Sequence, residues 1–287
     1  MIKLSACLIV KNEAHNLPRC LQSLKGLADE IHVLDTGSTD KSIAIAESFS
    51  CHVSQTVWTN HFAQVRNQVI KNAQGNWVLS IDADEWLTPT ASKALQKFLE
   101  QAAPAFYALR WQQSSEQTVS QKTVLFPNHR GIVYLGRVHE IPWDPSGQTP
   151  GPFLTDITLS HAPEHSPLGS EKVARYRQLL ALELQHPNEL ERFHALRHWG
   201  QSELILHQDQ QARETLTAAW QLVPELPAPA KVWGTAVLES LLFLACETRD
   251  TDAYHHWLRC YAQSYPQHPR LKILPDTIPV NNTVTER

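Results

Sequence analysis

The sequence lacks the glycine-rich loops that bind phosphate in two large classes of nucleotide-binding protein. Its 287 residues include only 10 glycines, and no G-x-G-x-x-G or G-x-x-x-x-G-K-[ST] pattern occurs. Such loops bring main-chain N–H groups close to a pyrophosphate, so their absence disfavours a Rossmann dehydrogenase and a P-loop NTPase. A nucleotide site in this chain would therefore depend on other groups.

Paired cysteines and an excess of positive charge are also missing. The five cysteines are scattered without a C-x-x-C pair, and we therefore expect reduced thiols in a cytoplasmic protein. The net charge of −4 gives no general basic surface, so we expect no nucleic-acid partner. Hydrophobic residues make up 42% of the chain, which is enough for one large domain or two ordinary ones.

Long apolar runs are absent as well. The longest strongly apolar stretch, Val237–Cys246, is much shorter than the roughly 20 residues that span a bilayer. The first residues are expected to enter a strand at once, which leaves no apparent signal peptide. We therefore expect no transmembrane segment, and any membrane contact would be peripheral.

The most informative stretch is a short apolar run that ends in three acids. Residues 77–81, WVLSI, fit a buried strand, and Asp82, Asp84 and Glu85 follow it. Open α/β sheets bind ligands at the carboxyl ends of their strands. Only Ala83 separates Asp82 from Asp84, so both carboxylates can approach one hard cation, Mg²⁺ or Mn²⁺. An isolated D-x-D is more often a solvated turn, and the preceding motifs decide between these interpretations.

The first half alternates between strand-like and helix-like segments. Strands are expected over residues 3–10, 30–34, 51–57 and 77–81, and helices over residues 17–24, 43–49 and 62–73. Short connections in this order predict a mostly parallel sheet with helices on both faces. Acids at three strand ends, Glu13, Asp35 and the Asp82/Asp84 pair, would then converge on one edge. Such an edge suits a nucleoside diphosphate, whose hydroxyl and N–H groups can donate to carboxylates.

Four segments, in this order, resemble family 2 glycosyltransferases. They are LIVKNEA at residues 8–14, VLDTGSTD at residues 33–40, F-A-x-x-R-N at residues 62–67 and GNWVLSIDADEWL at residues 75–87. Within this family, the four segments are similar to those of small cytosolic enzymes that act on lipopolysaccharide core or on peptides. The resemblance continues weakly to about residue 161. The resemblance implies the GT-A fold, a nucleotide-sugar donor that is usually a UDP-sugar, and Mn²⁺ or Mg²⁺ as cofactor.

The same resemblance assigns the first two motifs to the nucleotide. It implies that Val10, Lys11 and Glu13 line the base and ribose pocket, with the Glu13 carboxylate on the ribose. Asp35 would contact the base, usually uracil. Lys11 replaces the aromatic or small residue that often precedes Asn-Glu in the family, so no stacking contact with the base is implied there. Loop polarity and helix capping are the alternative explanations for Glu13 and Asp35.

The other two motifs are assigned to the nucleotide, the sugar and the metal. By the resemblance, Arg66 would help hold the nucleotide, and Asp82 would contact the ribose or the donor sugar. Asp84 would hold the metal and so take part in catalysis. A salt bridge on a helix surface is the alternative explanation for Arg66.

Transfer also needs a general base that takes the proton of the acceptor. The segment at residues 136–140, G-R-V-H-E, resembles an arrangement in the same enzymes, and Glu140 is the preferred base. Asp144 and Asp156 are the alternatives, and a surface carboxylate without a catalytic role explains Glu140 about equally well.

A histidine closes the last strand expected in the first half. Strands are expected over residues 106–111, 118–126 and 156–161, the last of which ends in His161. The resembling enzymes tend to have a histidine here, which implies a metal ligand or a contact to the diphosphate. Mixed oxygen and nitrogen ligation favours Mn²⁺ over Mg²⁺. Ala162-Pro163 departs from the family's usual His-x-Gly-Tyr, so no acceptor contact is implied there.

The second half changes to helical periodicity throughout. The proline-rich residues 160–169, SHAPEHSPLG, predict a linker, and apolar stripes between residues 173 and 261 predict paired antiparallel helices of tetratricopeptide-like type. We therefore expect a GT-A catalytic domain over residues 1–165, an all-α helical-hairpin domain over residues 170–270 and a disordered tail over residues 276–287.

Three functions remain open. The preferred one is a metal-dependent inverting glycosyltransferase that moves a sugar from a UDP-sugar to a saccharide, lipid-linked or peptide acceptor. A sugar-1-phosphate nucleotidyltransferase has a related fold, but LIVKNEA lacks the glycine-rich loop of those enzymes. A non-catalytic interaction protein would combine the helical region with a degenerate transferase domain.

Overall fold

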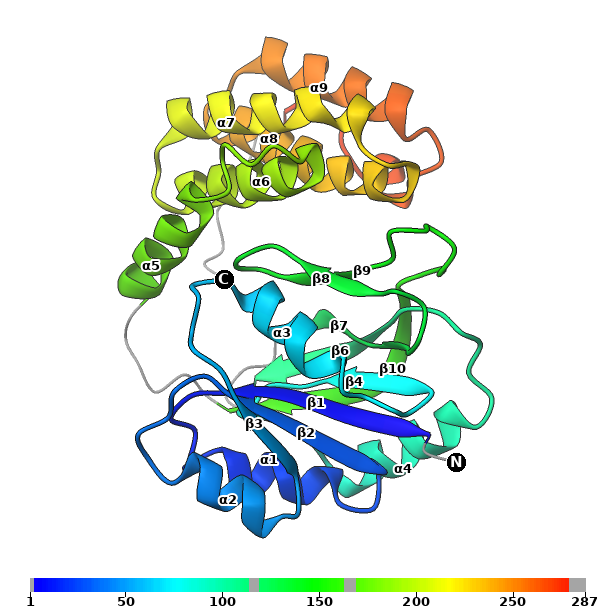
Figure 1. Cartoon of the computed structure of the whole chain (residues 1–287). Coiled ribbons are helices and arrows are strands. Elements are labelled where there is room, and N and C mark those ends of the chain that lie inside the picture. Colours follow the sequence, from blue (N-terminus) through cyan, green and yellow to red (C-terminus); the bar gives the residue numbers. More distant parts are fainter. Residues whose placement is uncertain (1–2, 114–118, 163–168, 279–287) are drawn as a thin grey trace. The chain divides into compact units, whose positions relative to one another are not determined.

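The computed structural model describes residues 3–113, 119–162 and 169–278. The chain divides into two compact units, Met1–Gly169 and Ser170–Arg287. The first unit is α/β and the second is helical, which confirms the predicted fold class (Figure 1). Residues 163–168 of the predicted linker and residues 279–287 of the predicted disordered tail lie outside the described residues.

An eight-stranded sheet in the order β3-β2-β1-β4-β7-β6-β10-β5 forms the first unit. Its strands are β1 (Leu4–Val10), β2 (Glu30–Asp35), β3 (His52–Gln55), β4 (Trp77–Ser80), β5 (Glu85–Leu87), β6 (Tyr107–Gln113), β7 (Val119–Pro127) and β10 (Phe153–His161). Strands β3, β2, β1 and β4 are parallel, and β6 is parallel to β10. Strand β7 is antiparallel to β4 and β6, and β5 is antiparallel to β10.

The strand register brings the ends of the parallel strands to one level. Val10, the last residue of β1, pairs with Asp35, the last residue of β2. On the other side of β1, Cys7 pairs with Ser80, so the acids that follow β4 come level with the end of β1. We call this side of the sheet the carboxyl edge, and the side where β1, β2 and β4 begin the amino edge.

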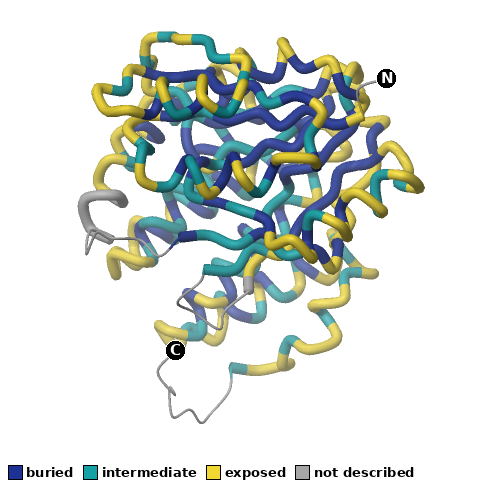
Figure 2. Tube along the Cα trace, turned by 90° about the horizontal axis from the view of Figure 1, so that it is seen from below, coloured by how far each residue is buried: buried dark blue, intermediate teal, exposed yellow. Residues whose placement is uncertain are grey.

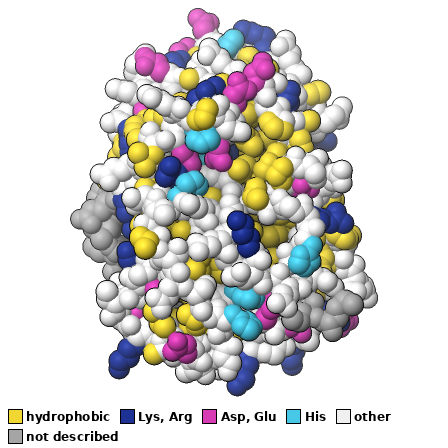
Figure 3. All heavy atoms as spheres, viewed as in Figure 1, with side chains coloured by type: hydrophobic (Ala, Val, Ile, Leu, Met, Phe, Trp, Pro, Cys, Tyr) yellow, Lys and Arg dark blue, Asp and Glu magenta, His cyan; other side chains and the backbone are white. Residues whose placement is uncertain are grey.

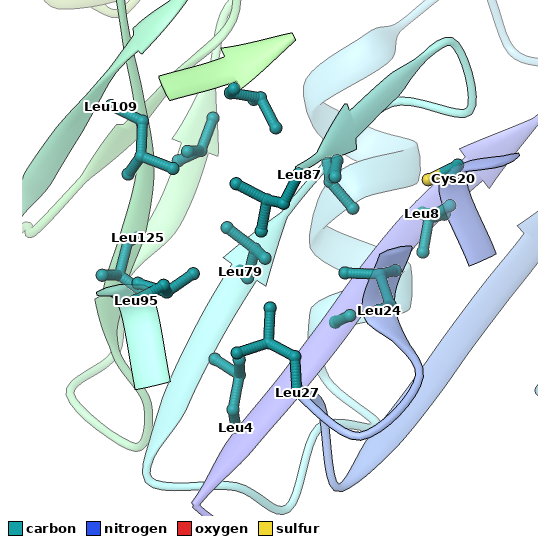
Figure 4. Close-up of a cluster of buried hydrophobic side chains, with 14 of the residues drawn as sticks. Leu4, Leu8, Cys20, Leu24, Leu27, Leu79, Leu87, Leu95, Leu109 and Leu125 are labelled. Carbon is teal, nitrogen blue, oxygen red and sulfur yellow. The ribbon is translucent and has the colours of Figure 1, made fainter. Parts of the chain in front are cut away.

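Helices cover both faces of the sheet, as predicted (Figure 1). Helices α1 (Leu17–Leu24), α2 (Ser42–Ser48) and α4 (Pro89–Leu99) lie on one face, and α3 (Phe62–Ile70) lies on the other. Successive side chains of β1 point to opposite faces of the sheet and so enter two hydrophobic cores. Leu4 and Leu8 pack with α1, whereas Cys7 packs with Val65 and Val69 of α3. Figure 4 shows the leucine-rich cluster on the α1 face. Strands β1, β2 and β4 are buried almost throughout (Figure 2).

Several short elements were not expected from the sequence. They are β5, α4 and a hairpin outside the main sheet, formed by β8 (Val133–Leu135) and β9 (Ile141–Trp143). The start signal of α4 is present, because Thr88 caps it through a bond from the Ala91 N–H and Pro89 occupies its first turn. The expected strand over residues 51–57 is shorter, and α2 ends one residue before Phe49.

The second unit consists of successive helices, of which α6 packs with α7 and α8 with α9. They are α5 (Gly169–Ala181), α6 (Glu189–Ile205), α7 (Asp209–Leu222), α8 (Gly234–Glu247) and α9 (Thr251–Ser264), with short 3₁₀ segments η1 (Val223–Glu225), η2 (Ala228–Trp233) and η3 (Pro269–Lys272). Helix α6 approaches α7 closely at Gly200, where an added Cβ would lie 2.6 Å from Leu216 Cγ. This contact fixes the α6–α7 crossing.

Two features bear on macromolecular partners. Acidic and basic side chains are interspersed on the face drawn in Figure 3. Among the described residues, one helical stretch, Ala228–Glu247, is long and apolar enough to cross a membrane by length and composition. Helix α8 within this stretch buries Val237, Leu241 and Leu244 in the second unit. A core helix passes the same test, so the stretch is weak evidence for a membrane span.

Candidate active site

The carboxyl edge presents a buried carboxylate at the end of β2. Asp35 is 2% exposed, and its Oδ1 accepts hydrogen bonds of 2.9 Å from the N–H groups of Gly37 and Ser38. Its Oδ2 is buried and has no hydrogen-bond partner among the described residues. A buried polar atom without a partner costs free energy. The free oxygen therefore fits a donor group of a ligand, such as the N–H of a base.

The loop after β1 is fastened to the loop after β2. The Asn12 N–H donates to Ser38 Oγ over 2.8 Å, and Asn12 Oδ1 accepts from the Thr39 N–H over 2.8 Å. Asn12 has a φ of +56°, in the left-handed region that asparagine tolerates better than most residues. Val10 is buried below this loop and Lys11 is exposed on it. The first two motifs therefore form one surface.

Glu13 lies within the field of the D-x-D acids. Its Oε2 accepts from the Asn16 amide over 2.9 Å, and its main-chain N–H donates to Ser42 Oγ. Burial raises the pKa of Glu13, and the nearby charges of Asp84 and Asp82 raise it further. The predicted convergence of Glu13 with these acids on one edge is therefore present.

Arg66 joins two acids from distant parts of the chain. Its Nη2 donates to Asp82 Oδ1 over 2.6 Å, its Nε to Glu140 Oε1 over 2.6 Å and its Nη1 to Ser80 Oγ over 3.0 Å. The Arg66 side chain is only 7% exposed. Burial opposes its charge most strongly, but Asp82 and Glu140 hold the pKa of Arg66 well above its usual range. Because all three nitrogens have protein partners, a contact between Arg66 and a nucleotide stays a prediction.

Lys122 is a second cation in the same network. Its Nζ lies 2.5 Å from Asp82 Oδ2 and 2.6 Å from Glu85 Oε1. Glu85 Oε1 also accepts from Trp111 Nε1 over 2.8 Å, and Glu85 Oε2 accepts from the Asp82 N–H over 2.8 Å. The third acid of the D-A-D-E stretch thus anchors the turn that presents Asp82.

The charges in this network hold each other ionised against burial. Burial opposes ionisation of Asp82, but Arg66 and Lys122 hold its pKa well below the usual range. Burial likewise disfavours the Lys122 ammonium, yet Asp82 and Glu85 raise the pKa of Lys122. For Glu85 burial prevails and raises the pKa, despite the neighbouring Lys122. Asp82 is therefore a firmly ionised acid between two cations.

Asp84 and His161 are brought together as a candidate metal pair. Asp84 Oδ2 lies 3.0 Å from His161 Nε2, and the His161 Nδ1 has no partner among the described residues. Two ligand atoms at about 2.1 Å from one ion and at right angles are about 3.0 Å apart, so the pair fits adjacent ligands of an octahedral ion. Within the described ranges, no group of three or more His, Cys, Asp or Glu side chains could hold a metal. Further ligands would have to come from water or a bound diphosphate.

His161 is coupled to this acid electrostatically. Burial lowers the pKa of His161, but the hydrogen bond and the charge of Asp84 outweigh burial and raise it. Trp111 packs against the imidazole with ring centroids 4.5 Å apart. The Ala162 N–H donates to the Asp84 carbonyl over 2.9 Å, which fixes the end of β10 on the D-x-D turn.

The loop that carries Glu140 is hydrogen-bonded to the start of α3. The N–H groups of Phe62 and Ala63 donate to the carbonyls of Arg137 (2.9 Å) and Gly136 (3.3 Å). These N–H groups belong to the first turn of α3, where no partner exists within the helix. The Glu140 side chain is 13% exposed. Arg66, which bonds the Glu140 side chain, lies one helical turn after Phe62 on α3.

The two alternative bases have other contacts. Asp144 is 3% exposed and accepts from Ser146 (2.8 Å to N, 2.6 Å to Oγ) and from the Thr149 N–H (2.8 Å). Burial would raise the pKa of Asp144, but these bonds lower it to about 2. The Asp156 side chain is 92% exposed and pairs with Arg110 at 2.7 Å. Both acids therefore have structural explanations, whereas Glu140 joins the Arg66 network.

Sequence reasoning missed Lys122, which lies inside an expected strand. A lysine within an otherwise apolar β-sequence needs a counter-ion if it is buried, and that was the available signal. Its partners are 40 and 37 positions away, and the antiparallel pairing of β7 with β4 was not foreseen. The remaining predicted residues lie at the carboxyl edge or on the hairpin next to it, and their functional roles stay predictions.

Solved structures with a similar fold include the S. aureus protein TarS. Residues 1–349 of TarS in complex with UDP-GlcNAc give a TM-score of 0.53 at 16% identity, covering 96% of this chain and 95% of that chain. The same TarS segment in complex with UDP gives a TM-score of 0.51 at 16% identity, covering 94% of this chain and 93% of that chain. This likeness concerns the fold and supports the GT-A architecture.

Sequence relatives match up to about half of this chain. A TPR repeat-containing protein of Synechococcus elongatus is 41% identical over 143 residues, which are 49% of this chain and 36% of that protein. An uncharacterized glycosyltransferase of Rickettsia bellii is 42% identical over 100 residues (34% and 32%), and the glycosyltransferase SunS of Bacillus subtilis is 26% identical over 163 residues (54% and 38%). The chain spans about a third of the length of these curated relatives.

The family model described as glycosyl transferase family 2 matches residues 5–164, more than half of the chain. The matched region contains every element of the carboxyl edge, from β1 with its Glu13 loop to β10 with His161. The chain therefore belongs to glycosyl transferase family 2.

Proposed function

We propose that this protein is a metal-dependent inverting glycosyltransferase that transfers a sugar from a UDP-sugar to an acceptor hydroxyl in the cytoplasm. The observation that carries the proposal is the Arg66 bridge, which binds Asp82 of the donor motif and Glu140 of the hairpin at 2.6 Å each. A bond from one guanidinium to both acids supports a base that acts beside the donor site. The UDP-GlcNAc and UDP complexes of TarS support uracil as the base.

Donor binding would use the residues at the ends of β1 and β2. The free Oδ2 of Asp35 can accept an N–H of the base, beside buried Val10 and exposed Lys11. Glu13 would accept a ribose hydroxyl, and Asp82 would use its partly exposed carboxylate for the ribose or the sugar. Each contact supplies an acceptor to a donor hydrogen, which is what these carboxylates can do.

Transfer would proceed by attack of the acceptor oxygen on the anomeric carbon. The new bond forms opposite the leaving group, so the configuration inverts. The bond from the anomeric carbon to the diphosphate oxygen breaks, and its electron pair goes to the diphosphate. Glu140 takes the acceptor proton. A divalent ion, Mn²⁺ or Mg²⁺, held by Asp84 and His161 would supply positive charge for the diphosphate.

The acceptor would be a saccharide, a lipid-linked saccharide or a peptide. The second unit, with its helical hairpins, would shape the binding of the acceptor or of a partner protein. A match to a TPR repeat-containing relative is consistent with an interaction role for such helices.

The first experiment is calorimetric titration of UDP, with and without Mn²⁺, into the wild type, Asp84→Ala and the exposed control Asp156→Ala. We expect metal-dependent binding in the wild type and the control and its loss in Asp84→Ala. Tight binding that is indifferent to metal and to Asp84 would contradict the metal assignment.

Turnover then separates the reaction classes. Incubation with UDP-sugars and candidate acceptors should release free UDP. Release of pyrophosphate from a nucleoside triphosphate and a sugar phosphate would instead indicate a nucleotidyltransferase. If no UDP, GDP, CDP or dTDP binds, the non-catalytic interaction protein becomes the better hypothesis.

A further inference from the structure

Lys122 lies on β7, the strand that pairs with β4 just before the D-x-D stretch. In this antiparallel pair, Val78 lies opposite Phe126 and Leu79 opposite Leu125, where the pairing ends. Beyond it, Lys122 Nζ lies 2.5 Å from Asp82 Oδ2 in the turn that follows β4.

The Lys122 ammonium has a hydrogen-bonding group to spare. An ammonium has three N–H donors, and those of Lys122 that have partners among the described residues reach Asp82 and Glu85. The Lys122 side chain is 31% exposed, whereas that of Arg66 is 7% exposed with all three nitrogens bonded. Lys122 is therefore the more accessible of the two cations, and it has an N–H group left for a ligand.

Lys122 also lies near the expected position of the donor's diphosphate. Lys122 is linked to His161 through Glu85 and Trp111: Glu85 Oε1 lies 2.6 Å from Lys122 Nζ and accepts from Trp111 Nε1, and the Trp111 ring packs against His161. In the ion-pair network around the D-x-D turn, three carboxylates, Asp82, Glu85 and Glu140, already share the two cations Arg66 and Lys122. A diphosphate bound beside Asp84 and His161 would add further negative charge, so an accessible cation there has a direct use.

We propose that Lys122 is a donor-binding residue whose third N–H group binds an oxygen of the donor's diphosphate. The site would then carry a cation supplied by the protein in addition to the divalent ion. Glu85, 1% exposed and bonded on both oxygens, serves as the fixed counter-ion that holds the ammonium in place. This inference rests on the proposed function, because it assumes a nucleoside diphosphate at the carboxyl edge.

The test compares UDP with uridine, which has the same base and ribose but no phosphate. Affinities are measured by calorimetry or ligand-observed NMR, in EDTA and with Mn²⁺, for the wild type, Lys122→Gln and the double variant Lys122→Met/Glu85→Gln. The double variant removes both charges of the pair, so that no buried carboxylate is left without a counter-ion. Lys93→Met, at an exposed position on α4, is the matched control.

We expect both Lys122 variants to lose about tenfold or more in affinity for UDP, in EDTA as well as with Mn²⁺. Affinity for uridine should change by less than about twofold, which also shows that the base pocket is folded. Lys93→Met should behave as the wild type.

Equal changes for UDP and uridine, or no change for either, would overturn the assignment and leave Lys122 a structural counter-ion. If Lys122→Met/Glu85→Gln does not fold, Lys122→Gln decides, since its amide can still donate to Asp82 or Glu85 without the charge. Failure of the wild type to bind UDP would instead reject the proposed function and the inference together.

Discussion

Buried or partly buried acids occur at both edges of the same sheet, but their surroundings differ. At the amino edge, Glu30 is 8% exposed and accepts from Ser5 Oγ (2.5 Å) and the Gln74 N–H (2.6 Å), with His32 Nε2 at 3.3 Å. At the carboxyl edge, Asp82 and Glu85 are held by the full charges of Arg66 and Lys122. Burial alone therefore does not distinguish a structural acid from one in a site.

The two edges differ in the polar atoms that their hydrogen bonds leave available to a ligand. Ser5 Oγ and the main chain close tightly around Glu30, and an added Cβ on Gly75 would lie 2.7 Å from Ser5 Oγ. The carboxyl edge instead keeps a partner-free oxygen on Asp35 and partly exposed carboxylates on Asp82 and Asp84. A closed cluster stabilises the fold, whereas an open one retains capacity for a ligand. Four predictions test this contrast, beginning with the largest effect.

Removing the proposed base should give the largest effect, and on activity. Glu140→Gln keeps the shape of the side chain but cannot take a proton, so we expect kcat to fall by about 10²–10⁴-fold. UDP affinity should stay within about threefold, because the change lies outside the donor pocket. The exposed alternative Asp156→Asn is the control and should retain activity. Full activity of Glu140→Gln together with loss of activity in Asp156→Asn would identify Asp156 as the base.

Breaking the Arg66 bridge should lower the free energy of unfolding. Arg66→Met leaves Asp82 and Glu140 without their shared cation, and loss of one partner from a buried ion pair costs about 3–5 kcal/mol. Urea unfolding measures this, with Arg110→Met as the matched control. The Arg110–Asp156 pair has a similar distance of 2.7 Å but is 47% and 92% exposed, so it should contribute only about 0–1 kcal/mol. Equal costs for the two variants would mean that the carboxyl-edge network contributes no more than a surface pair.

Changing the acid at the amino edge should affect stability but not binding. Glu30→Gln removes the charge that Ser5 and the Gln74 N–H solvate, and we expect a loss of about 1–3 kcal/mol in the free energy of unfolding. UDP affinity, measured by calorimetry, should equal that of the wild type. A selective loss of UDP affinity would show that the two edges are coupled. Glu30 would then not have a purely structural role.

The smallest effect is expected in the pH dependence of the same variant. Burial would raise the pKa of Glu30, but the bonds from Ser5 and Gln74 and the charge of His32 together lower it below its ordinary value of 4.5. The ionised carboxylate therefore stabilises the folded state above about pH 4.5, and this contribution is lost as the pH falls through the folded pKa. The stability gap between wild type and Glu30→Gln should shrink below pH 4 in urea titrations. A gap that widens with acid would mean that the pKa is raised.

The layered architecture could be predicted from local patterns because each strand of the parallel half is a contiguous apolar run followed by a polar turn. The end of β2 at Asp35 and the acids after β4 were placed at one edge by this rule alone. Strand β5 and the β8–β9 hairpin have only three residues per strand, too few for a periodic pattern. Lys122 escaped notice because its partners depend on an antiparallel pairing between segments 40 residues apart.

The mounting of the β8–β9 hairpin has a consequence for protein engineering. Four hydrogen bonds from α3 to the hairpin use the hairpin's main-chain atoms: those to the carbonyls of Gly136 and Arg137, and two between the Asn67 amide and the Tyr134 backbone. Main-chain atoms are present whatever the side chains are. Half-buried side chains of the hairpin, such as Val133 and Leu135, can therefore be exchanged while the main-chain attachment to α3 is kept. Libraries should be built at such positions, with the buried Tyr134, Val138 and Trp143 and with Glu140 and Asn67 left unchanged.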